Sequence, residues 1–247
     1  MPVEPSPTIW EFPPPARYHA DDDLVATGAD LEPGTLLSAY RHGLFPMPLG
    51  GRRAPMAWFS PVRRGVLRPG DLHVSRSLAK AARRFEIRVD TACAEVIDAC
   101  ADPRRPSGWI DGRIREAYLC LHDLGWVHSV ETWHDGRLVG GLYGVAIGGL
   151  FAGESMFHHE TDASKAALLG LVRLLDDGQD RLVDTQWRTP HLASLGVWEM
   201  SREEYLAQLP ALLATPEALF GDAAERTGPD VRISGRSGTV ARETGGG

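Results

Sequence analysis

The runs LFAGESMF (Leu150–Phe157) and RLVDTQW (Arg181–Trp187) each place polar residues where an apolar β-strand should end. If these two strands are neighbours, Glu154, Asp184 and Gln186 meet at one end of a buried sheet. Burial can shift the pKa of a carboxyl group into the range in which it exchanges protons with a substrate. The two runs therefore predict an enzyme.

The surrounding sequence predicts the topology of that sheet. Three antiparallel strands are expected at 127–133, 138–147 and 150–157, because hairpin turns (Asp135-Gly136 and Gly148-Gly149) separate them. A helix that begins at Asp162 or Ser164 then crosses over to the strand at 181–187. Glycines inside the middle strand predict a bulge or a closely packed backbone: Gly140, Gly141 and Gly144. Upstream, helices are expected from Ser75 to Arg84, from Thr91 to Cys100 and from Asp111 to Gly125, with a strand at 85–89.

This order predicts an α+β fold with a mixed sheet flanked by helices, like that of the N-acetyltransferases, although such an analogy does not set the function. Residues 1–62 are rich in Pro, Gly and Asp, with one helix expected at 35–42, and predict a small irregular N-terminal domain. The catalytic domain is expected at 63–220. Residues 221–247 lose apolar content, so we expect a disordered tail there.

Composition agrees with a folded cytoplasmic protein. With 247 residues, 43% of them hydrophobic and 24% charged, the chain can bury a substantial core. Its three cysteines form no C-x-x-C pair, which favours reduced core thiols. We find no export signal and no apolar run of membrane-spanning length in the sequence.

Charge is distributed unevenly along the chain, whose formal net charge is -7. Between residues 52 and 88, ten basic residues oppose two acidic ones, a local balance of +8, whereas residues 1–50 hold seven acidic and two basic residues. The basic run predicts a cationic face suited to phosphates, although a solvated arginine-rich helix would look the same.

Several familiar motifs are absent from the sequence. Phe157 replaces the final glycine of a G-x-S-x-G nucleophile elbow, and neither a phosphate-binding loop nor a dinucleotide fingerprint is present. The adjacent His158 and His159 lack the spacing of metal ligands, so we expect no metal. The segment 158–164 has two acidic residues and no glycine where an acetyltransferase holds the pyrophosphate of coenzyme A. The missing loop disfavours coenzyme A as the acyl donor, and the basic run before residue 90 points to a nucleic acid as the carrier of the acyl group.

Ordered motifs across most of the chain carry a resemblance to a known family. They are 26–31 (ATGADL), 39–46 (AYRHGLFP), 58–61 (WFSP), 73–78 (HVSRSL), 108–110 (GWI), 117–118 with 121–122, 128–131 (HSVE), 138–145, 153–157 (GESMF), 163–165 (ASK), 184–186 (DTQ) and 191–196 (HLASLG). With these motifs the sequence resembles the leucyl/phenylalanyl-tRNA-protein transferase family.

The resemblance implies an activity and its partners. Members of the family pair a small N-terminal domain with an acetyltransferase-like domain. They transfer Leu or Phe, and Met less well, from aminoacyl-tRNA to the α-amino group of proteins that begin with Arg or Lys, which marks those proteins for degradation. The resemblance implies no cofactor, no metal and no membrane.

The resemblance also implies roles for individual residues. Asp184 and Gln186 match a D-x-Q pair in which Gln contacts the attacking amine and Asp polarises it, although Asp184 could equally be structural. Glu154 matches a glutamate that orients the donor or the basic acceptor, with a structural hydrogen bond as the alternative. A donor pocket is also implied, and the basic run supplies a candidate tRNA-binding face. The pocket residues are Leu142, Phe151, Met156, Phe157, Leu171 and Val183, with Trp109 stacking on the terminal adenosine, and the basic residues are Arg76, Lys80, Arg83 and Arg84.

The sequence departs from the family pattern at three places. Met47 stands where a second adenosine-contacting Trp is usual, His158-His159 replaces a Ser-Arg pair, and Thr185 replaces a Cys. Two other functions stay open: a coenzyme A N-acetyltransferase of the same fold, and a non-catalytic RNA-binding protein that uses the basic run.

Overall fold

A computed structural model describes residues 1–50, 55–105 and 108–220. The expected tail at 221–247 and two arginines of the basic run, Arg52 and Arg53, lie outside these residues. The strands are β1 (Leu24–Thr27), β2 (Phe45–Pro48), β3 (Met56–Phe59), β4 (Arg63–Leu67), β5 (Glu86–Val89), β6 (Val127–His134), β7 (Arg137–Ile147), β8 (Leu150–His158), β9 (Leu182–Gln186) and β10 (Trp198–Ser201). The helices are α1 (Pro33–Arg41), α2 (Arg76–Ala82), α3 (Cys93–Cys100), α4 (Gly112–Asp123), α5 (Ala163–Leu175), α6 (Pro190–Ser194) and α7 (Arg202–Leu213), with 3₁₀ turns at Pro15–Arg17 and Pro69–Asp71.

The strands form two sheets. The small sheet has the order β1-β3-β2, and the large one has the order β10-β4-β9-β8-β7-β6-β5. In the large sheet β8 and β9 are parallel, while the other described pairs are antiparallel. The α+β class with a mixed sheet is therefore confirmed, and so is the neighbouring position of β8 and β9.

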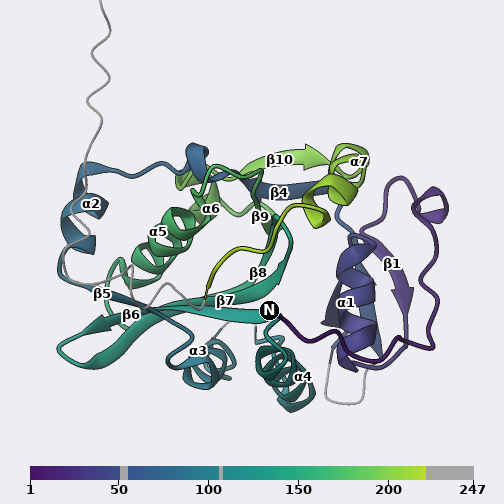
Figure 1. Cartoon of the computed structure of the whole chain (residues 1–247), viewed down its shortest axis with the longest axis horizontal. Helices are drawn as coiled ribbons and strands as arrows, with labels where there is room; N and C mark the ends of the chain where they lie inside the picture. Colours follow the sequence, from purple (N-terminus) through teal and green to yellow (C-terminus); the bar gives the residue numbers. More distant parts are fainter. Residues whose placement is uncertain (51–54, 106–107, 221–247) are drawn as a thin grey trace, which may run out of the picture.

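Helices cover both faces of the large sheet (Figure 1). Helix α5 lies on one face, with α2 packed beside it, and α3 and α4 lie on the other face. Helix α7 packs on β4, β8 and β10, and α1 contacts both α4 and α7. The division of the chain at residue 62 stays a proposal, which the change of sheet between β3 and β4 supports.

Local signals set most of the helix boundaries. The Ser75 hydroxyl accepts a hydrogen bond from the Leu78 N–H at the start of α2, and the Asp111 carboxylate caps α4. Gly125 has φ +80°, as expected just after a helix. Helix α5 begins where the sequence predicted: Asp162 directly precedes it, in a left-handed conformation, and its side chain makes no capping bond. Its carboxylate accepts from Lys165 instead.

Several elements were not expected from the sequence: the small-sheet strands β1, β2 and β3, and also β4, β10, α6 and α7. Strand β4 begins with Arg63 and Arg64, inside the run interpreted as a cationic face, yet it is a central strand between β10 and β9. Helix α7 begins with a capping box: the Ser201 hydroxyl accepts from the Glu204 N–H, and the Glu204 carboxylate accepts from the Ser201 N–H. Among the described helices, none has the length and hydrophobicity needed to span a lipid bilayer.

The glycines of β7 allow close packing, as the sequence predicted. The strand has an irregular register between Tyr143 and Gly144. At Gly140, a methyl group would lie 2.6 Å from Cβ and 2.9 Å from the carbonyl carbon of Ala163. The start of α5 therefore rests directly on the backbone of β7.

This contact gives a stability prediction. Gly140→Ala should lower the free energy of unfolding by about 1–3 kcal/mol, because backbone atoms of α5 must move to admit the methyl group. The matched control is Gly112→Ala in the first turn of α4, where a methyl group would meet nothing within 4 Å. The control should change stability by at most about 1 kcal/mol. Chemical denaturation measures both, and equal effects would contradict the close packing of α5 on β7.

Candidate active site

A cavity of about 220 Å³ lies at the end of β8 and β9, between α5 and α6. Most of its wall is apolar, and its polar groups gather where the strands end. The lining residues are Leu142, Phe151, Gly153, Glu154, Ser155, Met156, Leu168, Leu171, Val183, Thr185, Gln186, Thr189, His191 and Leu192. A concave apolar site with a few polar groups is typical of small-ligand sites.

The parallel pairing of β8 and β9 brings the polar groups together. Ala152 lies opposite Asp184 in the register of these strands. Glu154 and Gln186 each follow two residues later, so both reach the same end of the sheet and both line the cavity. The convergence expected from the sequence is thus present for these two residues.

Glu154 is a buried carboxylate that is held by two tyrosines. The Tyr40 hydroxyl of α1 donates to Oε1 at 2.7 Å, and the Tyr118 hydroxyl of α4 donates to Oε2 at 2.9 Å. The two hydroxyl oxygens lie 2.5 Å apart. Burial raises the pKa of Glu154 to about 7, although the two hydroxyl donors oppose this shift. The group can therefore gain or lose a proton near neutral pH.

Asp184 lies behind the cavity and does not line it. Its carboxylate accepts from Arg64 Nε at 2.8 Å and Nη2 at 2.5 Å, and from the Tyr205 hydroxyl at 3.0 Å. The Arg64 and Asp184 side chains are 1% and 0% exposed. Burial opposes the charge of Arg64, but the carboxylate outweighs it and raises the arginine pKa. Because Arg64 and Tyr205 already occupy both carboxylate oxygens, these contacts favour a structural role for Asp184.

Gln186 adopts an unusual backbone conformation that Asp184 stabilises. Its φ is +58°, in the left-handed region, and its N–H donates to Asp184 Oδ1 at 2.9 Å. A carboxylate that accepts from the N–H two residues later is a known way to hold such a turn. The strict alternation of β-strand side chains thus fails at Gln186. Its buried Nε2 has no hydrogen-bond partner among the described residues.

Most of the residues expected to form the donor pocket lie together at this cavity. Five expected residues line it: Leu142, Phe151, Met156, Leu171 and Val183. Phe157 does not, since it neighbours Met156 on β8 and faces the other side of the sheet, in the core with α3 and α4. Trp109 is half-buried against that same core and is not a lining residue.

Sequence reasoning missed several groups at the site. Tyr40 and Tyr118 belong to motifs that carry the family resemblance, but no role followed from their position in the sequence. Leu168 and Leu192 continue the apolar pattern of α5 and of the segment after β9. His191 stands at the rim, where burial, Lys165 and His158 lower its pKa.

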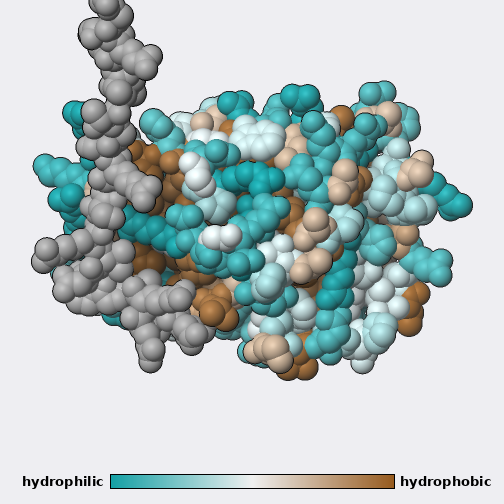
Figure 2. Space-filling model, turned by 45° about the horizontal axis from the view of Figure 1, so that its top comes forward, coloured by the Kyte–Doolittle hydropathy of each residue, from teal (hydrophilic) through white to brown (hydrophobic). Residues whose placement is uncertain are grey.

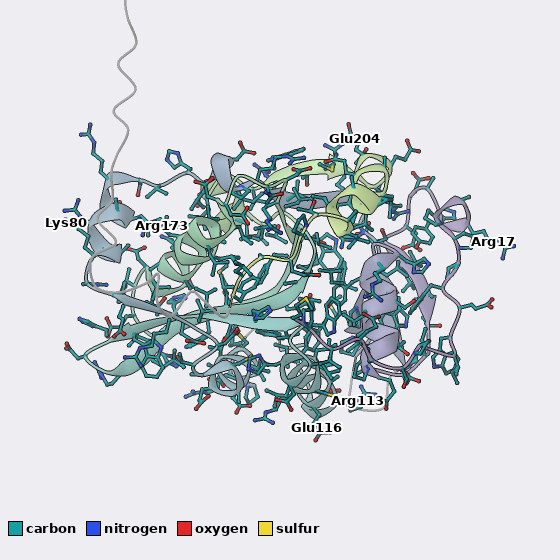
Figure 3. All side chains as sticks on the ribbon, viewed as in Figure 1. Arg17, Lys80, Arg113, Glu116, Arg173 and Glu204 are labelled. Carbon is teal, nitrogen blue, oxygen red and sulfur yellow. The ribbon has the colours of Figure 1, made fainter. Side chains whose placement is uncertain are left out.

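The expected basic face is smaller than the basic run. Arg64 is buried, Arg68 pairs with Asp180, and Arg88 pairs with Glu86. The four basic residues expected to bind tRNA do lie on or just after α2 and are exposed: Arg76, Lys80, Arg83 and Arg84. No salt bridge involves these four within the described residues. Lys80 points away from the molecule (Figure 3).

The surface around α2 and α5 also shows apolar groups. Figure 2 shows a face that is largely hydrophilic, with hydrophobic residues exposed on the side where α2 and α5 lie.

No group of three or more His, Cys, Asp or Glu side chains within the described ranges is placed to hold a metal ion.

Known proteins resemble this chain over most of its length. The family model described as "Leucyl/phenylalanyl-tRNA protein transferase" matches residues 66–210, and the model of that family's N-terminal domain matches residues 29–62. A leucyl/phenylalanyl-tRNA–protein transferase of Azoarcus sp. (strain BH72) is 50% identical over 203 residues, which cover 80% of this chain and 86% of that protein. One from Thiobacillus denitrificans is 48% identical over 218 residues, 86% of this chain and 95% of that protein. Among solved structures, a GCN5-related N-acetyltransferase-like protein from Streptococcus suis has a TM-score of 0.32 and 16% identity, and the match covers 56% of this chain and 57% of that one. That score is too low to support a conclusion.

The buried ion pair gives a second stability prediction. Asp184→Asn keeps an acceptor for the Gln186 N–H but leaves the guanidinium of Arg64 buried without a counter-charge. We expect a loss of about 3–5 kcal/mol in the free energy of unfolding. The matched control is Asp180→Asn, which breaks the exposed pair with Arg68 and should cost less than about 1 kcal/mol. Urea unfolding measures the free energy of unfolding of both variants. An Asp184→Asn protein as stable as the control would refute the structural role of Asp184.

Proposed function

Because the chain belongs to the leucyl/phenylalanyl-tRNA protein transferase family, we propose that it transfers Leu, Phe or Met to proteins that begin with Arg or Lys. The family supplies the coarse activity: an aminoacyltransferase with an aminoacyl-tRNA donor and a protein acceptor. One observation carries the finer proposal, namely an apolar cavity lined by both Glu154 and Gln186, where the buried Gln186 Nε2 has no hydrogen-bond partner among the described residues.

The cavity suits the side chain of the donor amino acid. Its volume of about 220 Å³ gives room for one large apolar side chain. The flexible thioether of Met156 adapts to Leu, Phe and Met alike, whereas side chains branched at Cβ meet crowding. With the side chain inserted, the ester carbonyl lies at the polar end of the cavity.

Gln186 would act on the reacting groups. Its Nε2 has no partner in the part of the chain that the structure describes, and it would donate to the oxygen of the ester carbonyl as negative charge develops there. Its Oε1 can accept from the attacking amine. Asp184 then serves as a positioning residue, because it holds the left-handed backbone that directs Gln186.

Glu154 would accept the proton of the acceptor amine. The Glu154 carboxylate and the hydroxyls of Tyr40 and Tyr118 make three close oxygen–oxygen contacts, one for each pair of groups. When Glu154 is ionised, only the two hydroxyl protons are available for these three contacts. A third proton, taken from the amine as the C–N bond forms, allows each contact to be a hydrogen bond. Glu154 can return that proton to the ribose oxygen as the ester C–O bond breaks.

The exposed basic residues of α2 would contact the tRNA backbone. Helix α2 packs beside α5, whose Leu168 and Leu171 line the cavity. Arginine and lysine side chains placed there would neutralise phosphates and bring the acylated end to the site. We place the reaction in the cytoplasm, where charged tRNA is made and used, and propose that the added residue marks the acceptor for degradation.

The coenzyme A alternative is less well supported by the site. At the N-terminus of α5, where a pyrophosphate would bind, Asp162 pairs with Lys165, and Glu160 accepts from His134. Carboxylates at that helix end repel a pyrophosphate. The RNA-binding alternative accounts for α2 but leaves the cavity and its polar end without a role.

A transfer assay tests the proposal. The purified chain should move radiolabelled Leu or Phe from charged tRNA to a peptide that begins with Arg, and should leave a matched peptide that begins with Glu unmodified. Gln186→Ala should lower kcat by about 10²–10³-fold. No transfer by folded protein from intact charged tRNA would refute it. Acetylation by acetyl-CoA without tRNA would favour the first alternative, and tight binding of uncharged tRNA without transfer would favour the second.

The pH dependence tests the role of Glu154. With a pKa of about 7, the carboxyl group is protonated below pH 7 and ionised above it, while a free α-amine loses its proton at about 7.7–8.0. Since both must be deprotonated, log(kcat/KM) for the acceptor peptide should rise with a slope of about 2 below pH 6.5. In Glu154→Gln the slope should fall to about 1, with kcat lowered by about 10²–10⁴-fold.

The control for this measurement is Ser155→Ala, which changes the next residue of β8 and should keep the steeper slope. A Glu154→Gln enzyme that retains the slope of the unaltered chain would show that another group takes the proton.

A further inference from the structure

The chain after α7 crosses back over the large sheet. We name residues 214–220 the C-terminal strap; it runs from α7 towards β7 and β8 (Figure 1). The match to the family model ends at residue 210, so the strap lies beyond it. The strap's last described residue, Phe220, is buried.

Hydrogen bonds hold the strap to the start of β8 and β9. Arg181 Nη1 donates to the carbonyl oxygens of both Gly148 and Pro216, each at 2.7 Å. The Gly148 N–H donates to the Glu217 carboxylate at 2.9 Å. Arg181 precedes β9 and Gly148 precedes β8, so the strap is fixed to the two strands that carry the site.

Phe220 packs between a fixed imidazole and a wall of the cavity. Its ring stacks on His128 with centroids 4.0 Å apart and an interplanar angle of 5°. The imidazole is itself held by Asp90, whose Oδ2 lies 2.7 Å from Nδ1. On its other side, the Phe220 ring lies 5.8 Å from the ring of Phe151, which lines the cavity.

Phe220 therefore supports the cavity from outside. Phe220 is not a lining residue, but it belongs to the same core cluster as Phe151, Leu142 and Val183, which are. On the side of β7, the Phe151 ring lies over Gly144, where an added methyl group would be 2.6 Å from it. Held between Gly144 and Phe220, the Phe151 ring has little freedom to move away from a ligand.

We propose that Phe220 is a specificity-determining residue for the donor: by fixing Phe151 it sets the depth of the cavity and favours Leu over Phe. This inference rests on the proposed function, since it takes the cavity to be the donor site. Without the Phe220 ring, Phe151 can recede into the space left behind it. The deeper cavity then gains room for a benzyl group and fits the shorter isobutyl group less closely.

The test compares kcat/KM for leucyl-tRNA and phenylalanyl-tRNA with one acceptor peptide. Phe220→Ala should raise the Phe-to-Leu ratio by about tenfold, the size of effect that a change of one or two carbon atoms in an apolar pocket produces. Phe220→Leu, which keeps most of the apolar volume, should shift the ratio in the same direction by a smaller factor. This second variant settles the question if the first does not fold.

The matched control is Phe85→Ala. Phe85 is also buried and packs on a histidine, with ring centroids 5.7 Å apart at His134, but it belongs to a cluster that contains no cavity residue. Its removal should leave the Phe-to-Leu ratio unchanged even if stability falls. An unchanged ratio in folded Phe220→Leu would overturn this inference. A complete lack of transfer by the unaltered chain would instead overturn the proposed function.

Discussion

The ion pair of Arg64 and Asp184 is the interaction on which the rest of the site depends. Arg64 on β4 also donates to the carbonyl of Gly43, which lies just before strand β2 of the small sheet, and lies over the ring of Phe45, in that strand. Asp184 on β9 also accepts from Tyr205 of α7. Because an unmatched buried charge costs several kcal/mol, these elements must assemble together. The same carboxylate then fixes the backbone of Gln186.

Two carboxylates at one end of the sheet have opposite surroundings. Asp184 faces a guanidinium, whereas the described residues give Glu154 hydrogen bonds from the neutral hydroxyls of Tyr40 and Tyr118. Neutral donors offset the effect of burial only in part, which leaves the pKa of Glu154 near 7. Environment, and not residue type, thus separates a carboxylate that holds structure from one that can exchange protons.

Much of the fold follows from local sequence, since the hairpin turns, helix caps and crossover that position β8 and β9 are local signals. The meeting of Glu154 and Gln186 follows from that topology. The burial of Arg64 does not, because an arginine in a basic run has the same local signature on a surface and in a core. The left-handed backbone of Gln186 could not be predicted from the sequence either, since non-glycine residues seldom adopt this conformation. The partners of Glu154 lie 36 and 114 residues away along the chain, so only the folded structure identifies them.

The position of Tyr40 links the N-terminal part of the chain to the chemistry. Helix α1 supplies this tyrosine, so Glu154 is shielded from water only while α1 is packed against α4. If α1 moved away, water would solvate the carboxylate and its pKa would fall towards that of an exposed glutamate. Glu154 would then be a weaker base and would lack the Tyr40 hydroxyl donor, so it would take the amine proton less readily. In the proposed mechanism, the N-terminal region therefore contributes to proton transfer, because α1 helps to maintain the dry surroundings that give Glu154 its basicity.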